Sequence, residues 1–489
     1  MRDAGEARHL ALLGRPAPPA RTIAERHASA LDRGAIDVAL EMARDAAEAG
    51  DDEHAARVLL GWLAGLEIDR ALGPVADWIE RWRSAARVVA GDGSAVAFDD
   101  VRRTIARQPG RDARAALERA RTAVIERELL PTLVERDARW REVVAGFDLA
   151  ASLAESVERT SGSALDALAD RAREGLARSA DAWRDTLSAA LRRRGSIAPG
   201  AAAFHDLTFA FGTDEIDGAF RAPGRLDVAR TVVREIGLGD ALETRLSIDA
   251  GPAAEVHERA ECVAVQPPGD VRVVIGSAGG MRAYDVALDE TGRALHLAHT
   301  DGDAPFEARA LGDPGTRAMC GRIMASLLLD RGWLSRQLAL SRSEAATVAR
   351  AIAGVALHDL RRACGATLYR TRWLAGDLAY GAAQELYVTT MTEAFGVAPP
   401  PVDALFEAPP TLVPGARMRG FEATGTLLDG LIERFDVDWY RNPRAGPWLA
   451  HSVFAAARGR LAADVVTRAV GRRPSLDRYI ERLETELSS

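Results

Sequence analysis

Apolar residues recur at the three- and four-residue spacing of an amphipathic helix along most of the chain. Short glycine-containing turns at residues 50–52 and 91–93 interrupt this pattern in its first part. The predicted helical stretches cover residues 22–99, 115–135, 140–156, 164–192, 311–334, 342–374, 378–395, 421–435, 448–470 and 475–487. The pattern therefore predicts a mainly α fold.

One short region has the pattern of a small β element, within residues 244–276. Residues 244–249 and 261–266 alternate polar and apolar side chains, and residues 271–275 form a β-branched run closed by Gly276. The glycine pair Gly279-Gly280 then leads into a predicted helix at residues 284–299. The stretch 195–200 is the best linker candidate, so we expect an N-terminal helical region at 1–195 and a second region at 196–489.

Composition narrows the function classes. A formal charge of -8 on 489 residues does not indicate a protein that binds nucleic acid. Three cysteines without CxxC spacing favour reduced, buried thiols over disulfides or a thiolate metal site. The apolar piece at residues 10–13 is too short for a signal peptide, and no run approaches the roughly 18 apolar residues of a membrane span. A soluble cytoplasmic protein with no membrane partner is expected.

The helix predicted at residues 284–299 carries the candidate chemistry. Asp289, Arg293 and His296 share one face at spacings i, i+4 and i+7, and Glu290 lies beside them. This is the layout of the His-Glu-x-x-His helix of zinc peptidases, with Asp289 and Arg293 in place of the two histidines. The general-base position keeps its glutamate, and the ligand positions do not keep their imidazoles.

With these residues, the chain resembles the M3 family of zinc metallopeptidases, the thimet oligopeptidase and oligoendopeptidase group. In that family a strand and a Gly-Gly turn precede the motif helix, as residues 271–275 and Gly279-Gly280 do here. The family's third ligand, a glutamate about 25 residues past the second histidine, falls at Ala318. Weaker matches follow in order at residues 361–369, 392–396 and 438–446, so the likeness covers roughly residues 216–486. The resemblance implies two helical lobes around a deep channel.

The resemblance also implies that replacing the zinc ligands removes the ability to hydrolyse peptides. The former metal-ligand positions are Asp289, Arg293 and Ala318, and an arginine stays protonated and has no lone pair for zinc. Without zinc, Glu290 is a vestigial general base facing water that it cannot activate usefully. Zinc is therefore expected to be absent and peptidase activity lost. We expect Arg293 to pair with Asp289 and to occupy the space of the ion.

The family's bound peptide implies a binding role for Gly279, Gly280, Met281 and His296. A tight turn explains the glycines equally well, and an ordinary hydrogen-bonded helix histidine is the simpler interpretation of His296. The favoured function is a catalytically inactive M3-like pseudo-peptidase that binds a peptide or protein segment in its channel, in a regulatory or scaffold role. Two alternatives stay open: a hydrolase using Glu290, Asp289 and His296 around a non-standard metal, and a structural assembly subunit.

Overall fold

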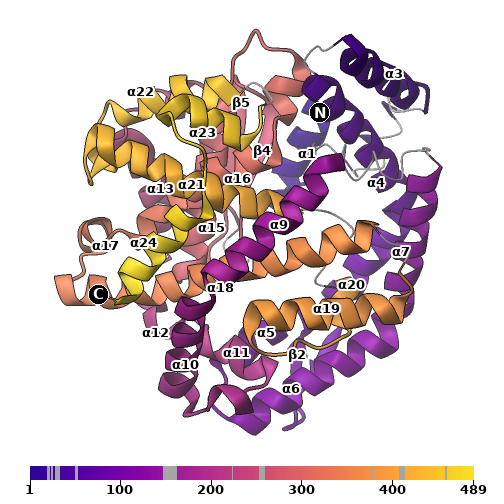
Figure 1. The fold of residues 1–489 in the computed structure, drawn as a ribbon, viewed down its shortest axis with the longest axis vertical. Helices are drawn as coiled ribbons and strands as arrows, with labels where there is room; N and C mark the ends of the chain where they lie inside the picture. The colour runs from indigo at the N-terminus through magenta and orange to yellow at the C-terminus, as the bar shows by residue number, and fades with distance from the viewer. Residues whose placement is uncertain are drawn as a thin grey trace. The chain divides into compact units, whose positions relative to one another are not determined.

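The structure is a computed structural model, and its fold is mainly helical with two small sheets (Figure 1). It describes residues 1–18, 22–23, 26–27, 33–49, 53–146, 162–222, 224–252, 259–375, 378–406, 413–457 and 460–488. The predicted mainly α fold with a minor β element is therefore confirmed. Part of the helix predicted at 140–156 lies outside the described residues.

Contacts divide the chain into two compact units, each made of separate segments. Unit 1 comprises Met1–Leu60, Thr213–Ala353 and Ala416–Ser489, and unit 2 comprises Gly61–Gly212 and Gly354–Gly415. The limits of these units do not coincide with the boundary expected after residue 195. That boundary stays a prediction about domains, since units defined by packing need not follow chain order.

The helices of unit 1 are α1 (Arg2–Leu12), α3 (Arg33–Ala49), α12 (Asp214–Asp217), α13 (Gly224–Glu235), α14 (Ala241–Thr244), α15 (Met281–Ala298), α16 (Pro314–Ala325), α17 (Arg331–Gln337), α21 (Val413–Phe435), α22 (Ala445–Leu449), α23 (Ala462–Val470) and α24 (Leu476–Ser488). Those of unit 2 are α5 (Val101–Arg107), α6 (Arg111–Val124), α7 (Leu130–Ala145), α9 (Gly162–Arg178), α10 (Ala180–Gly195), α11 (Phe204–Ala210), α19 (Tyr380–Phe395) and α20 (Asp403–Phe406). Three helices contribute residues to both units: α4 (Glu53–Ala85), α18 (Arg342–Ala375) and α21, whose residues 413–415 belong to unit 2.

The predicted β element is a three-stranded sheet of unit 1, in the order β3-β5-β4. The strands are β3 (Leu246–Ala250), β4 (Ala260–Gln266) and β5 (Asp270–Ile275), with β3 parallel and β4 antiparallel to β5. The valines and the isoleucine of β5 are buried, as expected for a central strand covered on both faces. Helices α15 and α1 both pack on this sheet. The sheet thus fixes the position of α15.

The helix predicted over residues 22–99 is wrong at its end. Residues Arg87–Val89 and Ala95–Ala97 form an antiparallel hairpin, β1 and β2, in unit 2. Its valines are β-branched, and the Asp92-Gly93 pair suits a tight hairpin turn, with Gly93 at φ +84°. Val88 joins the core of unit 2 with Phe98. The glycine turn at residues 91–93 therefore joins two strands and does not end a helix.

The helix predicted at 311–334 is broken into two. It contains α16, a 3-10 turn at Ser326–Leu329 and then α17. The break lies at Asp330, whose carboxylate accepts a hydrogen bond from the Trp333 N–H at 2.7 Å and caps α17. The helix predicted at 448–470 is likewise interrupted, by turns of π and 3-10 type between α22 and α23.

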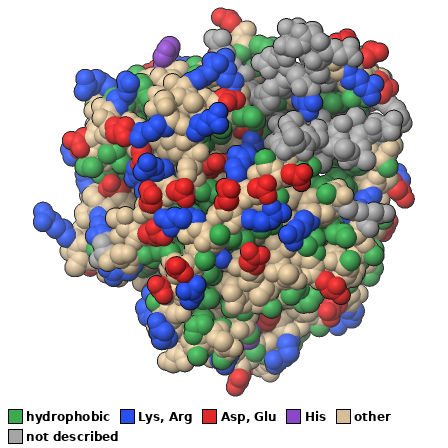
Figure 2. Space-filling model, in the orientation of Figure 1, with side chains coloured by type: hydrophobic (Ala, Val, Ile, Leu, Met, Phe, Trp, Pro, Cys, Tyr) green, Lys and Arg blue, Asp and Glu red, His purple; other side chains and the backbone are tan. Residues whose placement is uncertain are grey.

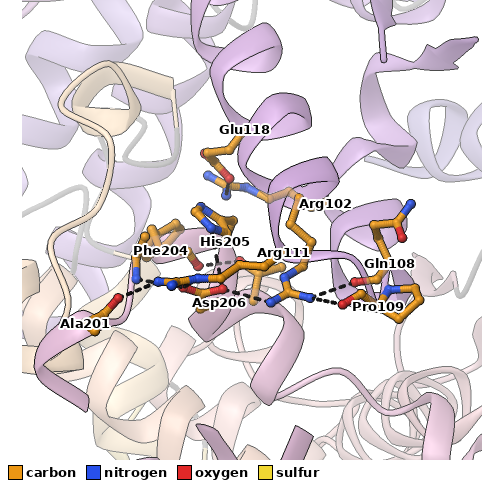
Figure 3. A network of polar contacts seen from close by, with 12 residues as sticks. Arg102, Gln108, Pro109, Arg111, Glu118, Ala201, Phe204, His205 and Asp206 are labelled. Atoms are coloured by element: carbon orange, nitrogen blue, oxygen red, sulfur yellow. Dashed lines mark hydrogen bonds and ion pairs between the residues drawn. The ribbon is translucent and has the colours of Figure 1, made fainter. Parts of the chain in front are cut away.

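A buried ionic network ties together α6 and α11 of unit 2 (Figure 3). Asp206 is fully buried and accepts hydrogen bonds at 2.9 Å from Arg114 Nη2 and from Arg111 Nη2. The Ala203 N–H donates to the same carboxylate at 3.1 Å. Arg114 also donates to the carbonyl oxygens of residues 108 and 109. A buried charge is tolerated here because it is paired and hydrogen-bonded.

No helix in the described part of the chain is both long and apolar enough to cross a membrane. On the face drawn in Figure 2, arginine side chains alternate with acidic ones. This interspersion of both signs on the face shown is typical of a solvated surface.

Candidate functional site

The candidate site is built on α15, which begins at a turn tied to the preceding segment. Gly280 has φ +99°, and its N–H donates to the Phe220 carbonyl at 2.8 Å. The Met281 N–H then donates to Asp217 Oδ1 at 2.9 Å. This carboxylate satisfies one of the free N–H groups of the first turn and favours the positive end of the helix dipole. The helix start is therefore fixed within unit 1.

Gly292 lets α15 approach α16 backbone to backbone. A Cβ added at Gly292 would lie 2.2 Å from the Cys320 carbonyl oxygen, far inside van der Waals contact. On α16, Gly321 plays the matching role, since its Cβ would lie 2.7 Å from the carboxyl carbon of Asp289. This close crossing brings charged side chains of the two helices together.

Replacing Gly292 with alanine is expected to destabilise the protein by about 1–3 kcal/mol, because the added methyl forces the two backbones apart. Chemical denaturation at pH 7 measures this loss. Gly65 is also inside a helix, and no described atom lies within 4 Å of its added Cβ, so Gly65→Ala is the matched control and should be neutral or stabilising. Equal effects of the two substitutions would contradict the close crossing.

The predicted pair of Asp289 and Arg293 is present, and a second arginine joins it. Asp289 is 6% exposed, and its Oδ1 accepts a hydrogen bond from Arg322 Nε at 2.6 Å. Arg293 Nε lies 2.7 Å from Asp289 Oδ2, an ion pair whose N–H direction does not meet hydrogen-bond geometry. Arg322 Nη1 also donates to Asp285 at 2.9 Å. Asp289 thus lies between two guanidinium groups.

These contacts decide how Asp289 ionises. Burial on its own would raise the pKa of Asp289, but the charges of Arg322 and Arg293 and the hydrogen bond from Arg322 outweigh it. The pKa of Asp289 lies below its ordinary value as a result. The carboxylate is therefore ionised at neutral pH and engaged by two cations.

Glu290 has a different environment on the same turn. Its Oε2 accepts a hydrogen bond from the Cys262 N–H of β4 at 2.9 Å, and its Oε1 lies 3.5 Å from Arg293 Nη1. Burial raises the pKa of Glu290, with Arg293 opposing the shift and Asp289 adding to it. Two neighbouring carboxylates therefore have pKa values moved in opposite directions. That pattern is typical of active sites, although structural ion-pair networks also produce it.

Ala318, at the position expected for the third ligand, is buried on α16. Its Cβ would lie 2.6 Å from a Cβ added at Gly420, so α21 packs directly on it. Arg322, one helical turn after Ala318, is the α16 residue that contacts Asp289. Arg322 is not among the predicted site residues, and its only signal in the sequence is the i, i+4 spacing from Ala318.

His296 is buried on the same helix. Burial lowers its pKa to about 3, with Arg317 adding to the shift, so the ring is neutral at pH 7. Its Nδ1 has no hydrogen-bond partner among the described residues, and its ring lies 6.1 Å from that of Phe454. His299 uses its Nδ1 in a 2.8 Å contact with the Leu295 carbonyl. These contacts therefore give His296 and His299 no shared hydrogen-bond partner among the described residues.

The residues present do not fit a zinc ion. Of the three ligand positions, Arg293 and Ala318 have no electron pair to donate, and the carboxylate of Asp289 is taken by two arginines. Across the described ranges, no three His, Cys, Asp or Glu side chains come close enough together to hold a metal.

The other predicted contact residues are held by the chain itself. A Cβ at Gly279 would lie 3.0 Å from the Phe220 carbonyl oxygen, and the N–H groups of Gly280 and Met281 are bonded as described above. Met281 is buried. The structure thus explains the glycine pair by a close turn and a helix start. A peptide-binding role for these residues and His296 stays a prediction.

The cysteines are free thiols, as predicted, and two of them lie near the site. Burial raises the pKa of Cys262 to about 12, and the nearby Glu290 adds to the shift. Burial also raises the pKa of Cys320. Neither thiol is activated as a nucleophile, because reactivity requires the thiolate.

Comparison with known proteins gives a likeness of fold. No protein-family model matches the chain, and no curated protein matches it in sequence. Among solved structures, it is similar to the M32 carboxypeptidase from Deinococcus radiodurans R1, with a TM-score of 0.54 at 15% identity. The match covers 100% of this chain and 96% of that one. The likeness therefore includes the first 195 residues, which in sequence resembled the M3 family only in being helical.

Proposed function

We propose that this protein is a pseudo-peptidase of M3 type that has lost its zinc and binds a peptide or protein segment. The observation that carries this proposal is the position of Arg293 and Arg322, which lie 2.7 and 2.6 Å from the two oxygens of Asp289. Two guanidinium groups supply the positive charge that a metal would bring, and neither can activate water as a metal does. The fold similarity to a carboxypeptidase supports a peptide as the ligand class.

The sheet offers a route for such a segment. Strand β4 is an edge strand, and the register with β5 directs the backbone of Ala260, Cys262 and Ala264 away from β5. The Cys262 N–H is already used by Glu290. A Cβ added at Gly5 of α1 would lie 3.0 Å from the Ala264 carbonyl oxygen. Ala260 is therefore the outward position without such a contact among the described residues. An extended peptide adding to an edge strand gains main-chain hydrogen bonds without any metal. The channel implied by the family resemblance stays a prediction.

Metal content is the first test. Purified protein, dialysed against buffer without chelator, is expected to carry far less than about one zinc per chain by mass spectrometry. The variant Asp289→His/Arg293→His/Ala318→Glu/Arg322→Gln restores three ligands and removes the neighbouring cation, so about one zinc per chain is expected to bind. Stoichiometric metal in the wild-type protein would overturn the proposal.

Peptide binding is tested separately, by fluorescence anisotropy with a library of unstructured peptides. The substitution Ala260→Pro removes an N–H directed away from β5 and keeps the ladder, since proline is tolerated on edge strands. It is expected to weaken binding about tenfold or more with little change in stability. A library that shows no binder at all would contradict the peptide proposal while leaving the metal result standing.

The second candidate is a hydrolase with an altered site, and the raised pKa of Glu290 favours it. It requires metal in the wild-type protein and peptide cleavage that Glu290→Gln abolishes. An assembly subunit, the third possibility, predicts self-association or a protein partner with no peptide affinity.

A further inference from the structure

Unit 2 contains a buried arginine whose hydrogen-bonding groups are unused. Arg370 on α18 is 1% exposed, and none of its three side-chain nitrogens has a hydrogen-bond partner among the described residues. The rings of Tyr369 and Trp373 lie 5.1 and 4.9 Å from its guanidinium carbon. Such cation–π contacts contribute stabilisation, but the rings accept none of the N–H groups in the guanidinium plane.

The surroundings of Arg370 do not neutralise its charge. The positive charge of Arg136, on α7, acts on Arg370, and Asp137 of the same helix interacts with Arg370, Arg136 and Arg141. Asp137 accepts a hydrogen bond from Arg141 Nε at 3.2 Å, and its Oδ1 has no partner within the described residues. Asp137 is thus shared by three arginines, and it makes no hydrogen bond to Arg370.

The pKa values of Arg370, which is buried, and of Asp137, whose side chain is 17% exposed, show the electrostatic cost of this arrangement. Burial lowers the pKa of Arg370 to about 10, so it still carries its proton at neutral pH. Burial also raises the pKa of Asp137, although three arginines oppose the shift. A buried charge without a partner costs several kcal/mol, so a compensating group is expected. Water could satisfy the N–H groups but would not balance the charge.

Another buried arginine on the same helix shows the contrast. Arg361 is 4% exposed, and its guanidinium donates to the carbonyls of Ala394, Leu176 and Glu393 and to the Ser179 hydroxyl. Its donors are thus used by the chain itself. Arg361 therefore has a structural role. No such set of acceptors within the described residues explains why Arg370 is buried.

We propose that Arg370 is the anchor of a binding site for a small oxyanion, a carboxylate or a phosphate, between α7 and α18 of unit 2. The planar fork of a guanidinium matches two oxygens of either group. The second positive charge of Arg136, whose Nε also has no partner in the described residues, adds to the attraction. The site lies in unit 2 and is independent of the function proposed above.

Isothermal titration calorimetry with inorganic phosphate and with acetate, at constant ionic strength in chloride, tests this proposal. The wild-type protein is expected to bind about one anion per chain, and its Tm to rise by about 2 °C in a saturable way. Arg370→Met should fold, because it removes an uncompensated charge, and should lose both effects. Binding of phosphate alone or of acetate alone identifies which oxyanion the site takes.

Arg361→Met is the matched control, with Arg361→Lys as its replacement if it does not fold. It is expected to lower the Tm and to keep anion binding. The proposal is overturned if neither anion binds the wild-type protein, or if Arg370→Met binds phosphate as well as the wild type does. If neither anion binds, water that bridges Arg370 and Asp137 explains the unused N–H groups. If Arg370→Met still binds phosphate, the anion binds at another place in the protein.

Discussion

Replacing Asp289 with alanine is expected to lower the free energy of unfolding by about 3 kcal/mol at pH 7. The substitution leaves Arg322 and Arg293 in a crowded helix interface without the carboxylate that both contact at 2.6 and 2.7 Å. Each arginine keeps a second acidic partner, Asp285 and Glu290 respectively, so the loss falls at the lower end of the range for a broken buried pair. Urea denaturation measures it.

Asp285→Ala is the matched control for this result. Asp285 belongs to the same helix and contacts the same arginine, but its side chain is more exposed and Arg322 keeps Asp289. Its loss is expected to cost about 1 kcal/mol or less. If both substitutions cost the same, Asp289 is not the centre of the cluster.

The pH dependence of the free energy of unfolding is a second test of the cluster formed by Asp289, Glu290 and the two arginines. The pKa of Asp289 in the folded protein lies below its ordinary value, so its stabilisation is complete above that value and is lost as pH falls through the folded pKa. The pKa of Glu290 is raised, so its ionisation costs stability as pH rises through its folded pKa. Glu290→Gln is therefore expected to flatten the stability profile above the ordinary glutamate range.

Sequence pattern predicted the site helix and the sheet because both depend on local periodicity. Residues 246–250, 260–266 and 270–275 form strands where alternation and β-branching indicated them. The i, i+4 spacing of Asp289 and Arg293 was enough to expect their contact, since neighbours on one helix face are fixed by helix geometry. These features required no knowledge of distant residues.

Contacts between elements could not be predicted in the same way. Periodicity gives the buried face of a helix but not the residue packed against it, so the contact of Arg322 with Asp289 was not foreseen. The glycines at 279–280 raised a similar difficulty, because a tight turn and a ligand contact require the same backbone freedom. The bonds that hold this turn, from the Gly280 N–H to Phe220 and from the Met281 N–H to Asp217, depend on a segment about 60 residues earlier.

The network around Asp206 illustrates the same limit, since its arginines are more than 90 residues away in sequence. It also yields the largest expected effect in unit 2. Asp206→Ala leaves Arg114, 1% exposed, with carbonyl partners only and a buried charge unpaired. The expected loss is about 3–5 kcal/mol in the free energy of unfolding, measured by urea denaturation at pH 7.

Asp99→Ala is the control for Asp206→Ala, because Asp99 pairs with Arg83 at 2.8 Å in a half-exposed position and should cost about 1 kcal/mol or less. Burial alone would raise the pKa of Asp206, but hydrogen bonds from Arg114, the Ala203 N–H and Arg111 outweigh it and hold it below 3.8. The contribution of the carboxylate is therefore complete above 3.8 and disappears as pH falls through the folded pKa. The stabilities of the wild type and of Asp206→Asn should accordingly converge in acid, and a gap that stays constant down to the lowest pH at which the chain folds would show that packing, not charge, makes Asp206 important.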